Sequence, residues 1–246
     1  MNPLSRRLSH FIDLDAGDQA ALDHLCENVR RIPRHSDVIS EGDRPDHTHL
    51  VLEGWAARYK IVPSGARQIT AFLIPGDFCD RHVGLLGEMD HSIGAITPLK
   101  VADLSHARIE AMMHSHPRLG RAFWWSTLVD EAVLRSWIVS LGRRSARERI
   151  AHLMCELHLR MSNVGLVKHG EFRMPLTQEQ LGDAMGLTSV HVNRMLRSLR
   201  SDGLITWASG DLVIQDIDRL RHVAGFDPNY LHLRARAGSE TRSLAS

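Results

Sequence analysis

The sequence of 246 residues is poor in cysteine and has no long apolar run. Its cysteines, Cys26, Cys79 and Cys155, are odd in number and far apart, which argues against a disulfide framework or an all-cysteine zinc site and predicts reduced thiols. No stretch approaches the roughly 20 apolar residues that a membrane helix needs. The N-terminus, MNPLSRRLSHFIDLD, lacks the apolar segment of a secretory signal. We therefore expect a cytoplasmic protein without a membrane partner.

The net charge is also small, but the charged residues are unevenly distributed along the chain. The formal net charge is +1, and the hydrophobic content of 43% is ordinary for a folded protein. Residues 1–142 hold 15 Lys and Arg against 18 Asp and Glu, whereas residues 143–246 hold 15 against 11. The length favours two domains. A basic C-terminal part suits a partner with a phosphate backbone.

The N-terminal half changes from a helical to a β-rich pattern. Residues 13–31 place Leu and Val at helical spacing, which predicts a helix. Residues 37–104 then form short β-rich runs, including HLVLEGWAARYKIV and QITAFLI, separated by the turn signals EGDRPD, PSGA and PGD. Several short strands at this spacing predict a sandwich or a small barrel.

Residues 107–141 return to a helical pattern. From Phe123 to Leu141, 12 of 19 residues are apolar, more than one buried stripe requires. We expect one face of this helix to pack on its own domain and another face on a second copy, through a seam with alternating spacings of three and four. A buried helix in a monomer is the alternative. The expected seam consists of Trp125, Leu128, Ala132, Arg135 and Val139.

The segment MPLTQEQLGDAMGLTSVHVNRMLRSLRSDGLITWASGDLVIQD gives the strongest functional signal. Thr177 and Gln180 form a capping box that begins a helix, and Gly186 can adopt the positive φ that ends it. Thr188 can cap a second helix with a polar, arginine-bearing outer face. The runs around Ser-Gly-Asp predict a hairpin wing. These features are typical of a major-groove reader, the alternative being a helical hairpin with a solvated face.

The order of a β-rich domain, a long interface helix, RRSARERIAHLM and LTQEQLGDAMGLTSVHVNRMLRSLRSDGLI resembles the Crp/Fnr family of bacterial transcription regulators. VISEGDRPDHTHLVLEGWAARYK and IPGDFC resemble the family's β-roll. The resemblance implies an α+β fold whose N-terminal double-stranded β-helix, the β-roll, is a cyclic-nucleotide-binding-like sensor domain. It also implies a non-enzymatic homodimer that binds double-stranded DNA and RNA polymerase. The implied parts are the β-roll at 10–106, a dimerisation helix at 107–142, a winged helix-turn-helix at 146–220 and a tail at 221–246.

The resemblance also assigns contacts with DNA. Base contacts fall on Ser189, Val190 and Arg194, and Arg194 matches the arginine that reads O6 and N7 of guanine. Val190 stands where many relatives have a glutamate that accepts a hydrogen bond from cytosine. Because valine offers only methyl contact, most naturally to thymine, the half-site is expected to differ at that base pair. The full set expected at the DNA is Gln178, Thr188, Ser189, Val190, His191, Asn193, Arg194 and Arg197.

PGDFCDRHVGLLGEMDHSIG lies where the resemblance places an effector site. Relatives that bind cyclic nucleotides have Gly-Glu after the Gly-Asp-Phe turn to hold the ribose, then Arg-Ser or Arg-Thr to neutralise the phosphate. Here Asp80 and Arg81 stand where the ribose-binding Gly-Glu would be, and acidic residues stand where the phosphate-binding Arg-Ser or Arg-Thr would be. The resemblance therefore disfavours cyclic AMP and leaves the effector unknown. The pocket candidates are Cys79, Asp80, Arg81, His82, Asp90, His91 and Ser92.

Three other interpretations of the β-rich half remain open. Cys79 and His82 are residue types that bind haem iron, and relatives with haem use this part of the roll. His47, His49 and Glu53 have a spacing similar to metal ligands of cupin-like enzymes, although solvated surface histidines are the default and no metal site is assigned. A polar loop without a small ligand is the third interpretation.

Overall fold

The structure, a computed structural model, describes residues 1–80 and 83–233. Two antiparallel sheets form the β-roll, one in the order β1-β7-β3 and the other in the order β2-β6-β4-β5. Their inner faces bury one apolar cluster that includes Val51, Ile93 and Val101. The strands are β1 (Val29–Ile32), β2 (Asp37–Ile39), β3 (His47–Glu53), β4 (Ala56–Ile61), β5 (Arg67–Leu73), β6 (Ser92–Ala95) and β7 (Leu99–Ser105).

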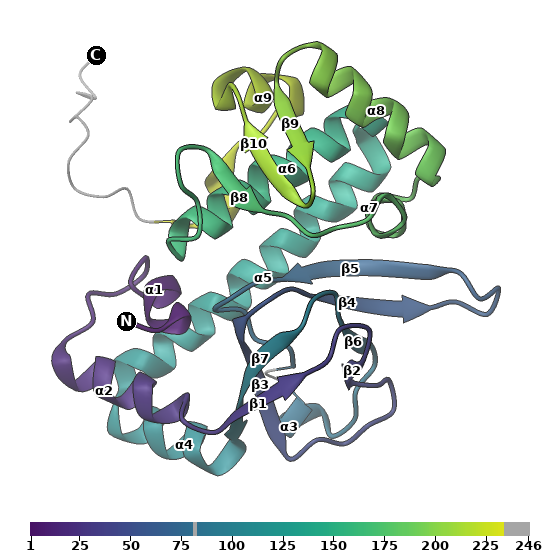
Figure 1. Ribbon diagram of the computed structural model, residues 1–246. Helices are drawn as coiled ribbons and strands as arrows, with labels where there is room; N and C mark the ends of the chain where they lie inside the picture. The colour runs from purple at the N-terminus through teal and green to yellow at the C-terminus, as the bar shows by residue number, and fades with distance from the viewer. Residues whose placement is uncertain (81–82, 234–246) are drawn as a thin grey trace, which may run out of the picture.

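Short helices flank the roll (Figure 1). They are α1 (Pro3–Leu8), α2 (Ala16–Leu25), α3 (Val83–Leu86) and α4 (His106–Ser115). The predicted helix at 13–31 is wrong in its second half, because α2 ends at Leu25 and Val29 pairs with Ala102 of β7. Pairing with a sheet satisfies the backbone of residues 29–32 more fully than an extra helical turn without a cap.

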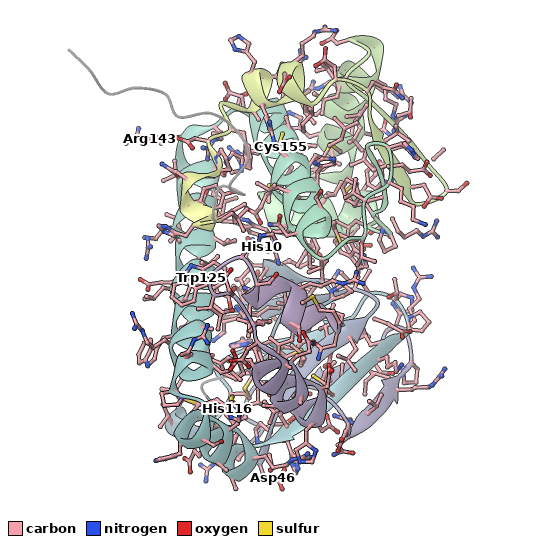
Figure 2. All side chains as sticks on the ribbon, turned by 90° about the vertical axis from the view of Figure 1, so that its left-hand side faces the viewer. His10, Asp46, His116, Trp125, Arg143 and Cys155 are labelled. Carbon is pink, nitrogen blue, oxygen red and sulfur yellow. The ribbon has the colours of Figure 1, made fainter. Side chains whose placement is uncertain are left out.

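The predicted helical stretch at 107–141 is two helices, α4 and α5 (Pro117–Arg143). The break falls at His116, which has φ −130° and ψ 73° and precedes Pro117. A residue before proline is pushed out of the helical region, and proline suits the first helical position because it has no N–H to leave unpaired. α5 then runs along one side of both domains, from His116 beside the roll to Arg143 beside the C-terminal domain (Figure 2).

The C-terminal domain combines helices with a small antiparallel sheet in the order β8-β10-β9. Strand β8 lies outside the predicted two-stranded wing. Residues 221–233, expected as part of a tail, pack into the domain instead, and Ala224 and Leu231 are buried. The elements are α6 (Ala146–Asn163), β8 (Glu171–Arg173), α7 (Gln178–Met185), α8 (Ser189–Ser201), β9 (Ile205–Ala208), β10 (Asp211–Ile214), α9 (Ile217–Ala224) and the 3-10 helix η1 (Pro228–Leu231).

The turn between α7 and α8 packs closely against α7 because a glycine, Gly182, lies at the contact. A Cβ atom added at Gly182 would lie 2.4 Å from the carbonyl oxygen of Leu187, on the backbone of the turn. Real Cβ atoms do not approach backbone oxygens so closely, so a side chain at this position would force the two helices apart. Gly182 therefore fixes how tightly the helix pair closes.

Gly182→Ala is expected to destabilise the C-terminal domain by about 1–3 kcal/mol, the usual cost of overpacking. The control is Gly120→Ala in α5, where the nearest atoms are those of the flexible Met113 side chain at 3.5 Å. Urea unfolding followed by circular dichroism measures both free energies of unfolding. A Gly182→Ala protein as stable as the Gly120→Ala protein would show that the turn has room to relax.

Candidate nucleic-acid interface

Local chemistry builds the helix pair as predicted. The Thr177 hydroxyl accepts a hydrogen bond from the Gln180 amide at 3.1 Å, and the side-chain oxygen of Gln180 accepts one from the Thr177 amide at 2.9 Å. Gly186 ends α7 with φ +64°, in the left-handed region. Thr188 caps α8 by accepting from the His191 amide at 3.3 Å. The capping box, the glycine turn and the second cap are thus confirmed.

α8 is sharply divided between an inner and an outer face. Val192, Leu196 and Leu199 are fully buried, and their burial fixes the rotation of the helix. The outer face therefore presents Ser189, Val190, Arg194 and Arg197 to solvent. Val190 is 81% exposed, which is unusual for an apolar side chain at the start of a polar helix face.

The remaining predicted DNA residues lie at the contact between α7 and α8. Gln178 accepts a hydrogen bond from the Asn193 amide group at 3.1 Å, and both side chains are half-buried. His191 is half-buried, and Thr188 is exposed but uses its hydroxyl as the cap. Of the eight predicted residues, α8 thus exposes Ser189, Val190, Arg194 and Arg197 to solvent, while Gln178 and Asn193 bind each other between the two helices.

The wing is a tight hairpin. β9 and β10 pair in register from Ile205 with Ile214 to Ala208 with Asp211. The two residues between them, Ser209 and Gly210, have φ values of +53° and +86°. Two consecutive positive φ values make the turn whose twist matches a two-residue hairpin. The predicted Ser-Gly-Asp turn is confirmed.

Comparison with known proteins agrees with this architecture. Residues 148–223 match the Crp-like helix-turn-helix domain, and residues 29–116 match the cyclic nucleotide-binding domain. The transcriptional activator protein FnrL of Cereibacter sphaeroides is 31% identical over 87% of this chain and 86% of its own length. The chain belongs to the Crp/Fnr family of transcription regulators. The same match supports its DNA-binding helix-turn-helix domain as a functional module.

Further relatives extend the likeness. The nitrogen fixation regulation protein FixK of Bradyrhizobium diazoefficiens is 29% identical, over 86% of this chain and 87% of its own. The solved structure of FixK2 from Bradyrhizobium japonicum superposes with a TM-score of 0.70 at 24% identity, covering 80% of this chain and 96% of that one. This likeness shows the fold of a Crp/Fnr regulator. The relatives carry the names of transcription regulators rather than enzymes.

The expected effector region of this Crp/Fnr chain is divided between the interior of the roll and its surface. Cys79 and Asp80 are buried, while Asp90 is exposed and binds the His91 ring at 2.5 Å. The hydroxyl of Ser92 accepts a hydrogen bond from the Glu41 amide. The predicted candidates Arg81 and His82 lie outside the described residues.

The interior part of this region contains an arginine that sequence reasoning missed. Arg58 of β4 pairs across the sheet with Ala71 and Ile93, both members of the cluster inside the roll. Its guanidinium donates to the carbonyl oxygen of Cys79 at 3.1 Å, and its Nε is buried without a partner. The two-residue period of a strand could have placed Arg58 inward, since Ala56, two residues earlier, belongs to the cluster inside the roll.

Asp80 is a buried acid of the β-roll whose carboxylate is only partly hydrogen-bonded. One carboxylate oxygen accepts from the His49 amide at 2.8 Å, and the other is buried without a hydrogen-bond partner, 3.8 Å from Nε2 of His49. Nδ1 of His49 lies 2.7 Å from Asp103. Burial raises the pKa of Asp80 to about 7, against the opposing effects of the His49 amide and the Arg58 charge. Asp80 thus titrates near neutral pH.

Neither haem ligation nor a cupin-like metal site gains support from the geometry. Cys79 is fully buried, and burial raises the pKa of its thiol well above the usual value, while the second candidate haem ligand, His82, lies outside the described residues. His47 contacts Asp46, His49 contacts Asp103 and Glu53 contacts Lys100, so the three expected ligands do not converge. Among residues 1–80 and 83–233, no group of three or more metal-binding side chains is clustered.

The predictions about the cysteines and about membrane helices can be compared with the described residues. Cys26, Cys79 and Cys155 are all unpaired and buried, as expected for reduced thiols. In the same part of the chain, none of the helices has the length and apolar character needed to cross a membrane.

The outer face of α5 carries a stripe with heptad spacing, here called the α5 stripe. Leu128, Arg135 and Val139 of the expected seam are exposed, but Ala132 is buried in its own subunit and Trp125 is half-buried, stacked on Phe11 at 5.3 Å. Trp124 and Ile138 are exposed in their place, at 64% and 70%. The α5 stripe consists of Arg121, Trp124, Leu128, Glu131, Arg135 and Ile138, spaced by three and four.

Asp80 should make stability fall as pH rises. An acid whose folded pKa is raised from 3.8 to about 7 holds its proton only in the folded state between these values, so that contribution is lost as pH rises through 7. Between pH 5 and pH 8 the wild type should lose about 3 kcal/mol of unfolding free energy relative to Asp80→Asn.

Urea unfolding of both proteins at intervals of pH measures this difference. Asp80→Asn keeps an acceptor for the His49 amide, so the variant preserves this backbone contact. Parallel pH profiles for wild type and variant would show that Asp80 is ionised throughout this range in the folded protein.

Proposed function

We propose that the protein is a homodimeric, sequence-specific transcription regulator that places one α8 helix in each of two major grooves, about one helical turn apart. The observation that carries this proposal is the outer face of α8, where short side chains at the N-terminal end are followed by Arg194 and Arg197. Short residues let the helix end approach the base edges, and the arginines reach bases and phosphates.

We infer a division of labour along α8. Arg194 reads guanine through two hydrogen bonds, and Val190, one turn earlier on the same face, contacts a thymine methyl group. Ser189 lies beside Val190 at the helix start. Arg197 lies further along the helix and contacts phosphate, where it adds affinity without selecting sequence. The half-site consequently departs from that of relatives with glutamate at the Val190 position.

We further propose that the α5 stripe is the dimer interface. Trp124, Leu128 and Ile138 are large apolar side chains that remain exposed in the single subunit, at 51–70%. The Arg135–Glu131 ion pair at 2.6 Å lies between them and is itself exposed. A seam of period 3.5 with apolar ends and a charged centre is typical of two helices packed in register.

We propose two further partners, RNA polymerase and an effector of the β-roll. RNA polymerase is the proposed partner at a promoter, which the activator names of FnrL and other relatives support. The effector is proposed to act through the β-roll and to differ from cyclic AMP. The reason is that Asp80, which is buried, stands near the place of the ribose-holding glutamate, and the charge near it is that of Arg58 rather than of a phosphate-binding Arg-Ser pair.

Variants of the two arginines test the division of labour on DNA. Arg194→Ala should weaken binding to the selected site by about 1–3 kcal/mol and relax one base pair. Arg197→Ala should weaken binding to selected and random DNA alike and lower the slope of log K against log salt by about 1. Site selection from random DNA, followed by titrations at several salt concentrations, measures both.

The same selection tests Val190, since the wild type should return thymine and Val190→Glu should return cytosine on the contacted strand. Equal losses on specific and random DNA for both arginine variants would contradict the assigned roles. A wild-type half-site with the glutamate-type base pair would contradict the role of Val190.

Charge introduced into the α5 stripe should separate the subunits. Leu128→Glu and Ile138→Glu are each expected to weaken dimerisation at least tenfold, about 1.4 kcal/mol, because a carboxylate would be buried in an apolar seam. Val62→Glu is the control, since Val62 is 44% exposed and lies outside α5. Sedimentation equilibrium measures the dissociation constants. Unchanged dimers in both variants would place the interface elsewhere.

A further inference from the structure

A buried charged network joins the two domains, and it is separate from the DNA-reading face of α8. Its centre is Asp77 in the Gly-Asp-Phe turn of the roll. One oxygen of its carboxylate binds Arg7 of α1, and the other binds Arg160 of α6 at 2.6 Å. The side chains of Asp77 and Arg160 are only 7% and 16% exposed. One acid of the roll is therefore held by two arginines that lie outside it.

The network continues through the C-terminal domain. Arg160 also binds the carboxylate of Glu156 at 3.0 Å and the carbonyl oxygen of Phe72 at 2.9 Å. Glu156 is fully buried and accepts hydrogen bonds from the Trp137 indole at 3.2 Å and the Tyr230 hydroxyl at 3.0 Å. A single set of contacts thus links the roll to α5, α6 and η1.

Electrostatics makes this contact specific for one arrangement of the domains. Burial disfavours the charge of Arg160, but the Asp77 and Glu156 carboxylates outweigh it and raise the pKa of Arg160, so the arginine stays charged. A shift of α6 that broke this contact without admitting water would leave buried charges without partners, which is much less favourable than separating an exposed pair. A second interdomain ion pair, Arg67–Asp183, is more exposed, at 37% and 22%, and tolerates such movement better.

Asp77 is also tied to the candidate effector region by the backbone. The carbonyl oxygen of Asp77 accepts from the Val51 amide at 2.9 Å, and the Cys79 amide donates to the carbonyl oxygen of His49 at 2.8 Å. Residues 77–79 therefore run beside β3 directly into Asp80. A displacement of Asp80 would shift this short segment and move the carboxylate that holds α6.

We propose that the Asp77–Arg160 pair is an interdomain latch, which holds the DNA-binding domain in the orientation seen here and transmits to α6 any movement of residues 77–80. Arg7 keeps the carboxylate in place from the side of α1, and Glu156 orients the guanidinium from α6. Trp137 and Tyr230 act through Glu156 and are positioning residues.

The test measures opening at the hinge between α5 and α6. Arg144 lies there half-buried, its guanidinium bound to the Ser140 hydroxyl and its carbonyl oxygen accepting from Arg149, so trypsin gains access to the bond after Arg144 when the hinge opens. Asp77→Asn and Arg160→Gln should each raise the cleavage rate of the full chain by about tenfold or more. The double variant should be cleaved no faster than the faster single variant, because both changes break one contact.

Asp183→Asn is the matched control, since it removes the exposed interdomain pair and should change the rate less than about twofold. Asp77→Asn keeps an acceptor for the Ile74 amide, which Asp77 binds at 2.8 Å. If it nevertheless unfolds the roll, Arg160→Gln and Glu156→Gln carry the same test from the other domain.

Rates in the Asp77 and Arg160 variants that match the Asp183 control, or effects that add in the double variant, would overturn the latch. Because trypsin cleavage requires no DNA, this outcome is independent of whether α8 reads the proposed half-site.

Discussion

The arrangement of the two domains depends on a hydrophobic core that crosses the boundary between them. Phe72 and Ile74 of the roll, Trp137 of α5 and Met154 and Leu157 of α6 belong to one buried cluster. The rings of Phe72 and Trp137 meet edge to face at 5.9 Å. Because apolar burial has no preferred direction, this core by itself would tolerate some rotation of one domain on the other. Orientation must come from groups with directional contacts.

The buried charges supply that direction. Glu156 and Arg160 lie within the same layer as the core, and a charge there is tolerated only where its hydrogen bonds are satisfied. Such a pair adds less to stability than an apolar replacement often would, but it strongly disfavours the wrong geometry. A regulator benefits from this combination, since its DNA-binding domain must hold one orientation and change it when a signal arrives.

Local patterns predicted the helix-turn-helix well because its determinants are local. Thr177, Gly186 and Thr188 act on residues within one helical turn, so their effect is visible in the sequence. The buried and exposed faces of α5 were harder to predict from the sequence. Trp124 and Trp125 are both apolar, and the packing of Phe11 against Trp125 decides which of them turns inward. β1 was missed for the same reason, as its partner β7 lies about 70 residues later. The Asp77 network depends on contacts between distant strands and helices, which no spacing reveals, whereas strand alternation from Ala56 does place Arg58 inward.

The outer face of α8 and the interior of the β-roll also differ in what their side chains indicate about a ligand. On α8 the proposed DNA-reading side chains Ser189, Val190, Arg194 and Arg197 face solvent, so their hydrogen-bonding capacity, or its lack in Val190, is available to a partner. In the roll the polar groups face one another. Arg58 and Asp80 each retain a buried polar atom without a partner, and such atoms are costly unless water or a ligand reaches them. The roll therefore keeps partnerless polar atoms of Arg58 and Asp80 inside its core, and these atoms are the structural basis for the proposal that it holds an effector.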